Sequence, residues 1–140
     1  GEGCAARFWR IHRKDWKEAG HYPAQRVGQV FELPHHALAY RIQTLLQALT
    51  VPIGPIPPRL GHAHSLFART LQRHRALSFL QREGVTALLN AAHPGVAYPL
   101  TKDEVRSRVE SAWRLGDPER ILDVARELGE MNAQECPLLE

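Results

Sequence analysis

The sequence contains little cysteine and no long apolar run, and each shortage excludes a class of protein. Only two cysteines, Cys4 and Cys136, occur in 140 residues. Two cysteines do not make the disulfide framework of a small secreted domain, so we expect a reducing compartment, with one bridge between the two ends of the chain as the alternative. No stretch approaches the roughly 18 apolar residues of a membrane-spanning helix, so the sequence predicts no transmembrane span.

Strand patterns are scarce as well. Apolar and polar residues alternate only briefly, at 27–33, where we expect a short extended segment. Elsewhere the apolar residues recur at helical spacing, which predicts an all-α fold. We expect a three-helix bundle with a C-terminal helical hairpin, preceded by an extended or helical N-terminal arm. The predicted parts are a basic arm with one amphipathic helix at 1–50, a Pro-rich connector at 51–60 and the bundle at 61–140.

Charge is distributed unevenly along the chain. Residues 1–82 carry 12 Lys and Arg against 4 Asp and Glu, whereas residues 83–140 carry 6 against 11. A basic first half suggests an anionic partner, such as nucleic acid, phospholipid head groups or an acidic protein surface, although a solvated basic surface fits equally well.

Three helices are predicted before the hairpin. Leu38, Ile42, Leu45 and Leu49 form one apolar stripe, which predicts a helix at 34–50. The next helix covers 61–80, and its inward face begins at Leu66 and Phe67 and continues through Thr70, Leu71, His74, Leu77 and Leu80. A third covers 81–92 and ends at His93-Pro94-Gly95. Only Gly84 marks the join between these two helices, so a bend there is uncertain.

The clearest helix signals form a helical hairpin at 101–129. A capping box opens its first helix, because Thr101 can cap and Glu104 follows three residues later. A glycine stands where that helix must end with a positive φ, and an Asp-Pro pair starts the next helix. Gly129 can end the second helix, unless Met131 prolongs it. The residues that define the hairpin are Thr101, Glu104, Trp113, Gly116, Asp117, Pro118, Ile121 and Leu128; we expect Trp113 to face the core.

Catalytic and metal-binding patterns are missing. The sequence has no Gly-x-Ser-x-Gly, no phosphate-binding Gly-x-x-x-x-Gly-Lys-Ser/Thr and no dinucleotide-binding glycine motif. Its eight histidines lack zinc-site spacing, because His35 and His36 diverge on a helix and His62 and His64 do not share a helical face. We therefore predict no catalytic, cofactor-binding or metal-binding residues.

A family resemblance rests on three segments. The hairpin turn reads Gly-Asp-Pro-Glu-Arg-Ile-Leu at 116–122 and leads to Ala125, Glu127-Leu128 and Met131. Val-Pro-Ile-Gly-Pro-Ile stands at 51–56, and Leu-Phe-Ala-Arg-Thr-Leu at 66–71. With these segments, residues 51–131 resemble the alpha-subcomplex subunit five family, small helical accessory subunits of mitochondrial complex I (NADH:ubiquinone oxidoreductase). Residues 1–50 have no counterpart in that family.

The resemblance implies a noncatalytic accessory subunit that holds no cofactor. It would lie on the matrix side of the mitochondrial inner membrane, in a hetero-oligomer with core subunits of the complex I matrix arm. Its role would be assembly and stability of the arm that passes electrons from NADH to ubiquinone. Two alternatives stay open: a mitochondrial ribosomal or other RNA-associated protein, suggested by the basic first half, and a free helical enzyme or metal protein that uses the histidines.

Overall fold

The computed structural model describes residues 1–54 and 65–139. These ranges contain no β-strand, only isolated bridges between Glu2 and Glu135 and between Arg26 and Thr44, and the predicted all-α class is confirmed. The helices of the described ranges are α1 (Ala6–Ile11), the 3-10 helix η1 (Arg13–Trp16), α2 (Val27–Val30), α3 (Leu38–Arg41), α4 (Leu45–Thr50), α5 (Leu66–Ala92), α6 (Lys102–Leu115) and α7 (Pro118–Asn132).

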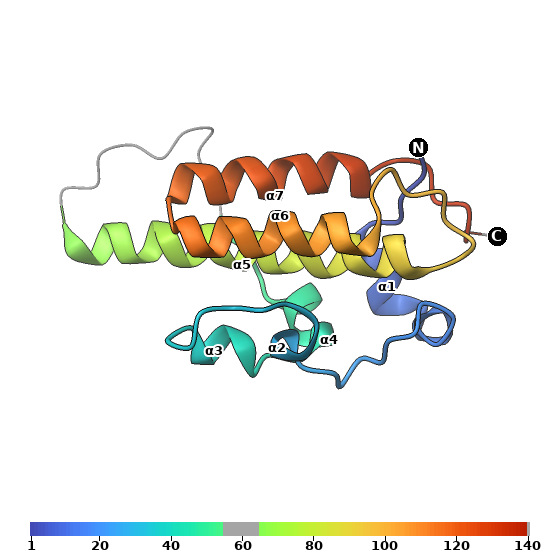
Figure 1. The fold of residues 1–140 in the computed structure, drawn as a ribbon, viewed down its shortest axis with the longest axis horizontal. Coiled ribbons are helices and arrows are strands. Elements are labelled where there is room, and N and C mark those ends of the chain that lie inside the picture. The colour runs from blue at the N-terminus through green and yellow to red at the C-terminus, as the bar shows by residue number, and fades with distance from the viewer. Residues whose placement is uncertain (55–64, 140) are drawn as a thin grey trace.

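The long helix α5 lies between two groups of helices (Figure 1). The antiparallel pair α6 and α7 covers one side of it, and the short helices α1 to α4 lie on the other side, with α1 and α4 in contact with α5. Both chain termini lie at the end of the molecule where α5 finishes. No helix among the described residues has the length and apolar character needed to cross a membrane.

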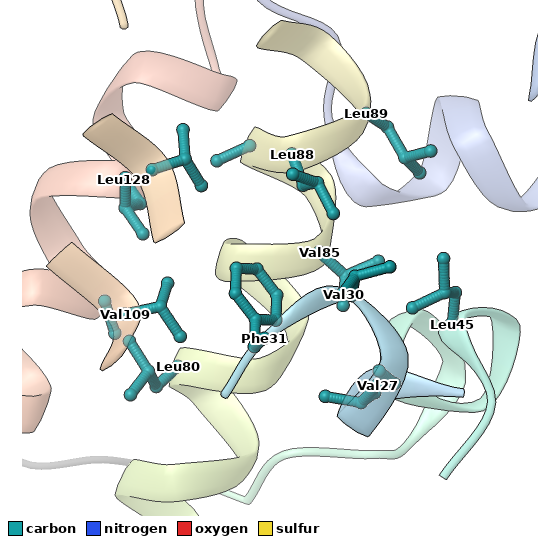
Figure 2. Packing of buried hydrophobic residues seen from close by; sticks show 14 of the residues in the cluster. Val27, Val30, Phe31, Leu45, Leu80, Val85, Leu88, Leu89, Val109 and Leu128 are labelled. Atoms are coloured by element: carbon teal, nitrogen blue, oxygen red, sulfur yellow. The ribbon is translucent and has the colours of Figure 1, made fainter. Parts of the chain in front are cut away.

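One hydrophobic core joins the two groups of helices (Figure 2). Leu80 and Leu88 of α5 pack near Val109 of α6 and Leu128 of α7, and Phe31 packs into the same cluster. The first fifty residues contribute fully buried aromatic and aliphatic side chains as well, among them Trp9, Trp16, Leu45 and Leu49. These residues therefore stabilise the same core as the hairpin; the predicted division into arm, connector and bundle stays a prediction.

The single helix predicted at 34–50 is wrong, because the structure breaks it into α3 and α4. Thr44 caps α4 by accepting a hydrogen bond from the Gln47 N–H over 3.0 Å. The backbone at the break bonds elsewhere: the Gln43 carbonyl accepts from the Val27 N–H, and the Leu45 N–H donates to the Gln25 carbonyl. The stripe is thereby split, and Leu38 and Ile42 stay exposed.

The prediction of an extended segment at 27–33 is also wrong over its first half. Residues Val27–Val30 form a helical turn, started by a hydrogen bond from the Arg26 N–H to Gln29 Oε1. Backbone angles are extended at Phe31, where φ is −123° and ψ is 139°. The apolar side chains of this segment are nevertheless buried, and Phe31 lies against α5 beside Gly84.

The two helices predicted at 61–80 and 81–92 are one continuous helix, α5. Gly84 does not bend it; a Cβ atom at Gly84 would lie 3.0 Å from Cγ2 of Val109, so glycine permits α6 to approach closely. The predicted end at His93 is confirmed. Residues 61–64, with His62 and His64, lie outside the described residues, as does most of the predicted connector, 55–60.

The hairpin has the helix ends that the sequence predicts. Thr101 and Glu104 form a complete capping box, and Gly116 ends α6 with a φ of 66°. Asp117 caps α7 and Pro118 occupies its first turn. The second helix continues past Gly129 to Asn132, the longer of the two predicted ends.

Cys4 and Cys136 are joined by a disulfide. The structure thus shows the bridge that the sequence left open as an alternative, not the free thiols that a reducing compartment favours. The two chain ends lie side by side, since the Gly3 N–H donates to the Glu135 carbonyl over 3.0 Å. The Cα atoms of the two cysteines are 4.6 Å apart, a separation that a disulfide spans.

Candidate interaction surface

The apolar face of α5 is covered along only part of its length. Its later residues Leu77 and Leu80 are buried, whereas Leu66 and Phe67 in the first turn are 73% and 78% exposed. Figure 1 shows the start of α5 extending beyond the turn between α6 and α7. The predicted inward face therefore continues past the hairpin that would cover it.

The hairpin turn adds a second element to this exposed end. Position 116 requires glycine because its backbone adopts left-handed angles. The Gly116 carbonyl accepts a hydrogen bond from the Arg73 guanidinium of α5. Leu115, directly before the turn, is 69% exposed. We call the exposed leucine and phenylalanine side chains at this end the α5 tip surface; its members are Leu66, Phe67, Leu71 and Leu115.

A pocket of about 360 Å³ opens beside the α5 tip surface, between α3, α5 and α6. The Tyr40 hydroxyl and His74 Nδ1 share a hydrogen bond of 2.6 Å across it. Tyr40 also packs edge-on against Trp113, with 5.1 Å between ring centroids. Burial raises the pKa of Tyr40, and the nearby Arg73 guanidinium acts in the opposite direction. The pocket thus combines aromatic walls with a positive charge.

The predicted hairpin residues lie along the whole length of the hairpin and do not meet at one site. Thr101 and Glu104 cap the end of α6 farthest from the turn, and Ile121 and Leu128 are buried in the core. Only Trp113 lines the pocket; it is 4% exposed, as expected of a core residue. The hairpin is therefore a scaffold, and its turn is the part that borders the candidate surface.

Sequence reasoning missed the residues that meet across the pocket. Tyr40 and His74 stand 34 positions apart and belong to different helices. The signal that could have indicated a surface was the apolar face itself, because it begins at Leu66, well before the hairpin can cover it.

The histidines of the described ranges do not assemble a metal site. No three His, Cys, Asp or Glu side chains gather there as metal ligands. The buried His93 accepts from the Gly95 N–H at Nδ1 over 2.9 Å, and its Nε2 lies 3.3 Å from Glu18 Oε2. In His21, burial lowers the pKa, while a hydrogen bond to Gln25 acts in the opposite direction. These two histidines pack within the fold.

Comparison of this chain with protein-family models, with curated proteins and with solved structures finds no match.

Proposed function

We propose that this protein is a noncatalytic helical subunit that docks into a larger protein assembly through the α5 tip surface. Its scaffold is a three-helix bundle of α5, α6 and α7. The assembly that the family resemblance suggests is respiratory complex I, where the chain would bind core subunits of the matrix arm and support the arm's assembly and stability.

The observation that carries the proposal is the exposure of Leu66 and Phe67. Large apolar side chains that gather in one exposed patch are typical of protein interaction sites. Arg69, Arg73 and Arg75 lie on the same stretch of α5, so the patch has a basic border. A partner that fits it has an apolar groove with acidic residues at its edge.

The Cys4–Cys136 bridge bears on where such an assembly lies. Disulfides persist in oxidising compartments and are rare where thiol-reducing systems operate. The bridge therefore weighs against the matrix placement that the family resemblance suggests, and it favours an oxidising face of a membrane complex. Alkylation of intact organelles, followed by mass spectrometry of both cysteines, tests the placement: free thiols are expected for a matrix protein.

A native gel of mitochondrial membranes tests the proposal directly. The chain should migrate with the NADH-oxidising band, and Phe67→Asp should release it from that band because a charge cannot be buried unpaired in an apolar groove. Tyr22→Asp is the matched control, since Tyr22 is 57% exposed and lies outside the tip surface. Absence of the wild-type chain from the band would rule out complex I, and an unaffected Phe67→Asp variant would rule out the tip surface.

The pocket beside the tip surface favours one second candidate, an RNA-associated protein. Tyr40 and His74 offer ring faces and Arg73 offers a guanidinium, a combination that can hold bases and phosphates. Co-sedimentation with ribosomes that RNase abolishes would support this candidate. An association without a steep salt dependence would exclude it, because phosphate contacts release counterions.

A further inference from the structure

A second pocket, of about 510 Å³, lies among α1, the end of α4, the middle of α5 and the end of α7. Three arginines line it, Arg7 and Arg10 on α1 and Arg82 on α5. Arg7 and Arg10 stand three residues apart, so both project from the same side of α1. Arg82 follows Phe67 by fifteen residues, or about 20 Å along α5, so this pocket is separate from the tip surface.

The charges in this pocket do not balance. Glu83 is the one carboxylate among the described residues that line it, and both its oxygens are engaged: Oε2 accepts from Arg82 Nε over 2.7 Å, and Oε1 accepts from Asn132 Nδ2 over 3.2 Å. In the described part of the chain no carboxylate lies within 4.0 Å of Arg7 or Arg10. Among the residues that the structure describes, Arg7 and Arg10 therefore bring two positive charges to the pocket without a counter-charge.

Arg10 gives a more specific indication. Its Nε atom is buried and has no hydrogen-bond acceptor among the described residues. Leaving a buried N–H without an acceptor is costly, so native proteins rarely do so. A rotation of the Arg10 side chain toward the pocket that it lines would let an anion there supply the missing acceptor. A phosphate group suits such a place, because a guanidinium can donate two parallel hydrogen bonds to it.

A more apolar pocket adjoins this one. It has a volume of about 410 Å³, and Arg7 lines both pockets. Phe8 and the exposed side chains of Ile11 and Leu139 line it, and these last two are 62% and 60% exposed. The two pockets adjoin each other, because Arg7 and Ala133 line both, and together we call them the groove, with a positive part and an apolar part. Each has the size of a small-molecule site.

We propose that this groove binds an alkyl phosphate, with the phosphate at Arg7 and Arg10 and the alkyl chain along Ile11 and Leu139. The same group is offered by a soluble alkyl phosphate and by the head group of phosphatidic acid in a membrane. This ligand site is independent of docking through the α5 tip surface, and either can fail without the other.

Titration of the whole protein with inorganic phosphate and with hexyl phosphate, followed by calorimetry, tests the site. Hexyl phosphate should bind about tenfold more tightly or better, because part of its chain leaves water. Arg7→Ala with Arg10→Ala should weaken both ligands by about tenfold or more, whereas Arg13→Ala, outside the groove, should change neither. Ile11→Ser should weaken hexyl phosphate alone. Circular dichroism verifies folding, and Arg10→Lys, which keeps the charge but loses the Nε–H fork, replaces any variant that does not fold.

Vesicles separate the two sources of the ligand. Binding to phosphatidic acid vesicles but not to phosphatidylcholine vesicles, lost in the arginine variants, assigns the site to a lipid head group. Tight binding of hexyl phosphate without vesicle binding assigns it to a soluble ligand. Equal affinities for phosphate and hexyl phosphate, or full binding by the double arginine variant, would overturn the proposal. So would a glutamate-rich peptide that binds the groove while hexyl phosphate does not compete with it.

Discussion

Asn90 and Asn132 hydrogen-bond to each other in the interior of the protein, where Nδ2 of Asn90 donates to Oδ1 of Asn132 over 3.1 Å. Both residues are almost fully buried. Asn90 also binds the N-terminal segment: its Oδ1 accepts from the Cys4 N–H and from Trp9 Nε1, and its Nδ2 donates to the Cys4 carbonyl. One side chain of α5 thus connects the first residues of the chain to α7.

Asn90→Ala should be strongly destabilising. It would leave the N–H and carbonyl of Cys4 and the Trp9 Nε1–H without the partner that Asn90 provides, and each unpaired buried group costs about 1–3 kcal/mol, whereas Asn132 keeps its hydrogen bonds to Tyr98 and Glu83. We expect a loss of about 3 kcal/mol or more in the free energy of unfolding, measured with urea. Gln134→Ala is the control, because this exposed side chain donates a hydrogen bond to the Glu130 carbonyl one helical turn earlier. A loss under about 1 kcal/mol for Asn90→Ala would contradict the network's importance.

Removal of the disulfide should lower stability without changing the fold. Cys4 and Cys136 are 132 positions apart, so the bridge closes nearly the whole chain into a loop and restricts the unfolded state. We expect Cys4→Ala with Cys136→Ala to lose about 2–4 kcal/mol, measured by chemical denaturation. Dithiothreitol should destabilise the wild type similarly and leave the double variant unchanged. A wild type insensitive to reductant while its thiols become alkylated would contradict this expectation.

Replacing each of two helical glycines by alanine should change the stability of the protein in opposite directions. At Gly84 a Cβ atom would lie 3.0 Å from Val109 Cγ2, so overpacking should cost about 1–3 kcal/mol. At Gly129 the nearest atom, Glu83 Cγ, is 3.6 Å away, so alanine should raise stability by up to about 1 kcal/mol through its helix propensity. Thermal unfolding of both variants checks the pair. Equal changes in the melting temperatures of Gly84→Ala and Gly129→Ala would show that α6 does not approach Gly84 closely.

The capping box should make stability depend on acidic pH. The Thr101 backbone N–H donates to Glu104 Oε1, and this bond, with the Thr101 hydroxyl, lowers the pKa of Glu104 below 4.5. The ionised carboxylate therefore favours the folded state; its contribution is complete above pH 4.5 and is lost as the pH falls through the folded-state value. The melting temperatures of wild type and Glu104→Ala should differ at neutral pH and converge in acid. For Glu130→Ala, which removes no cap, we expect no such convergence.

Local signals predicted the hairpin well. Each helix end of the hairpin depends only on residues within one or two helical turns of it, so it forms wherever the hairpin lies in the fold. These ends are the cap at Thr101, the left-handed turn at Gly116 and the start at Asp117. The same reasoning failed at 34–50. The carbonyl of Gln43 and the N–H of Leu45 bond to Val27 and Gln25, more than four helical turns earlier in the sequence, and no local pattern indicates such a pairing.

The candidate surface was predictable only in part. The sequence contains the apolar face that begins at Leu66, but the length of α5 left uncovered depends on where the hairpin turn meets Arg73. The meeting of Tyr40 with His74, and of Arg7 and Arg10 with the end of α7, depends on chain segments that are distant in sequence. Such contacts arise from packing of the whole chain.

The sequence by itself determined the all-α class, the ends of the hairpin helices and the stop at His93, because periodicity and capping are properties of neighbouring residues. Only the tertiary structure decided that α5 is continuous through Gly84, that Cys4 meets Cys136, and which apolar and basic side chains stay uncovered. Those outcomes depend on close approach between distant segments, which burial of the common core and the hydrogen bonds of Asn90 bring about.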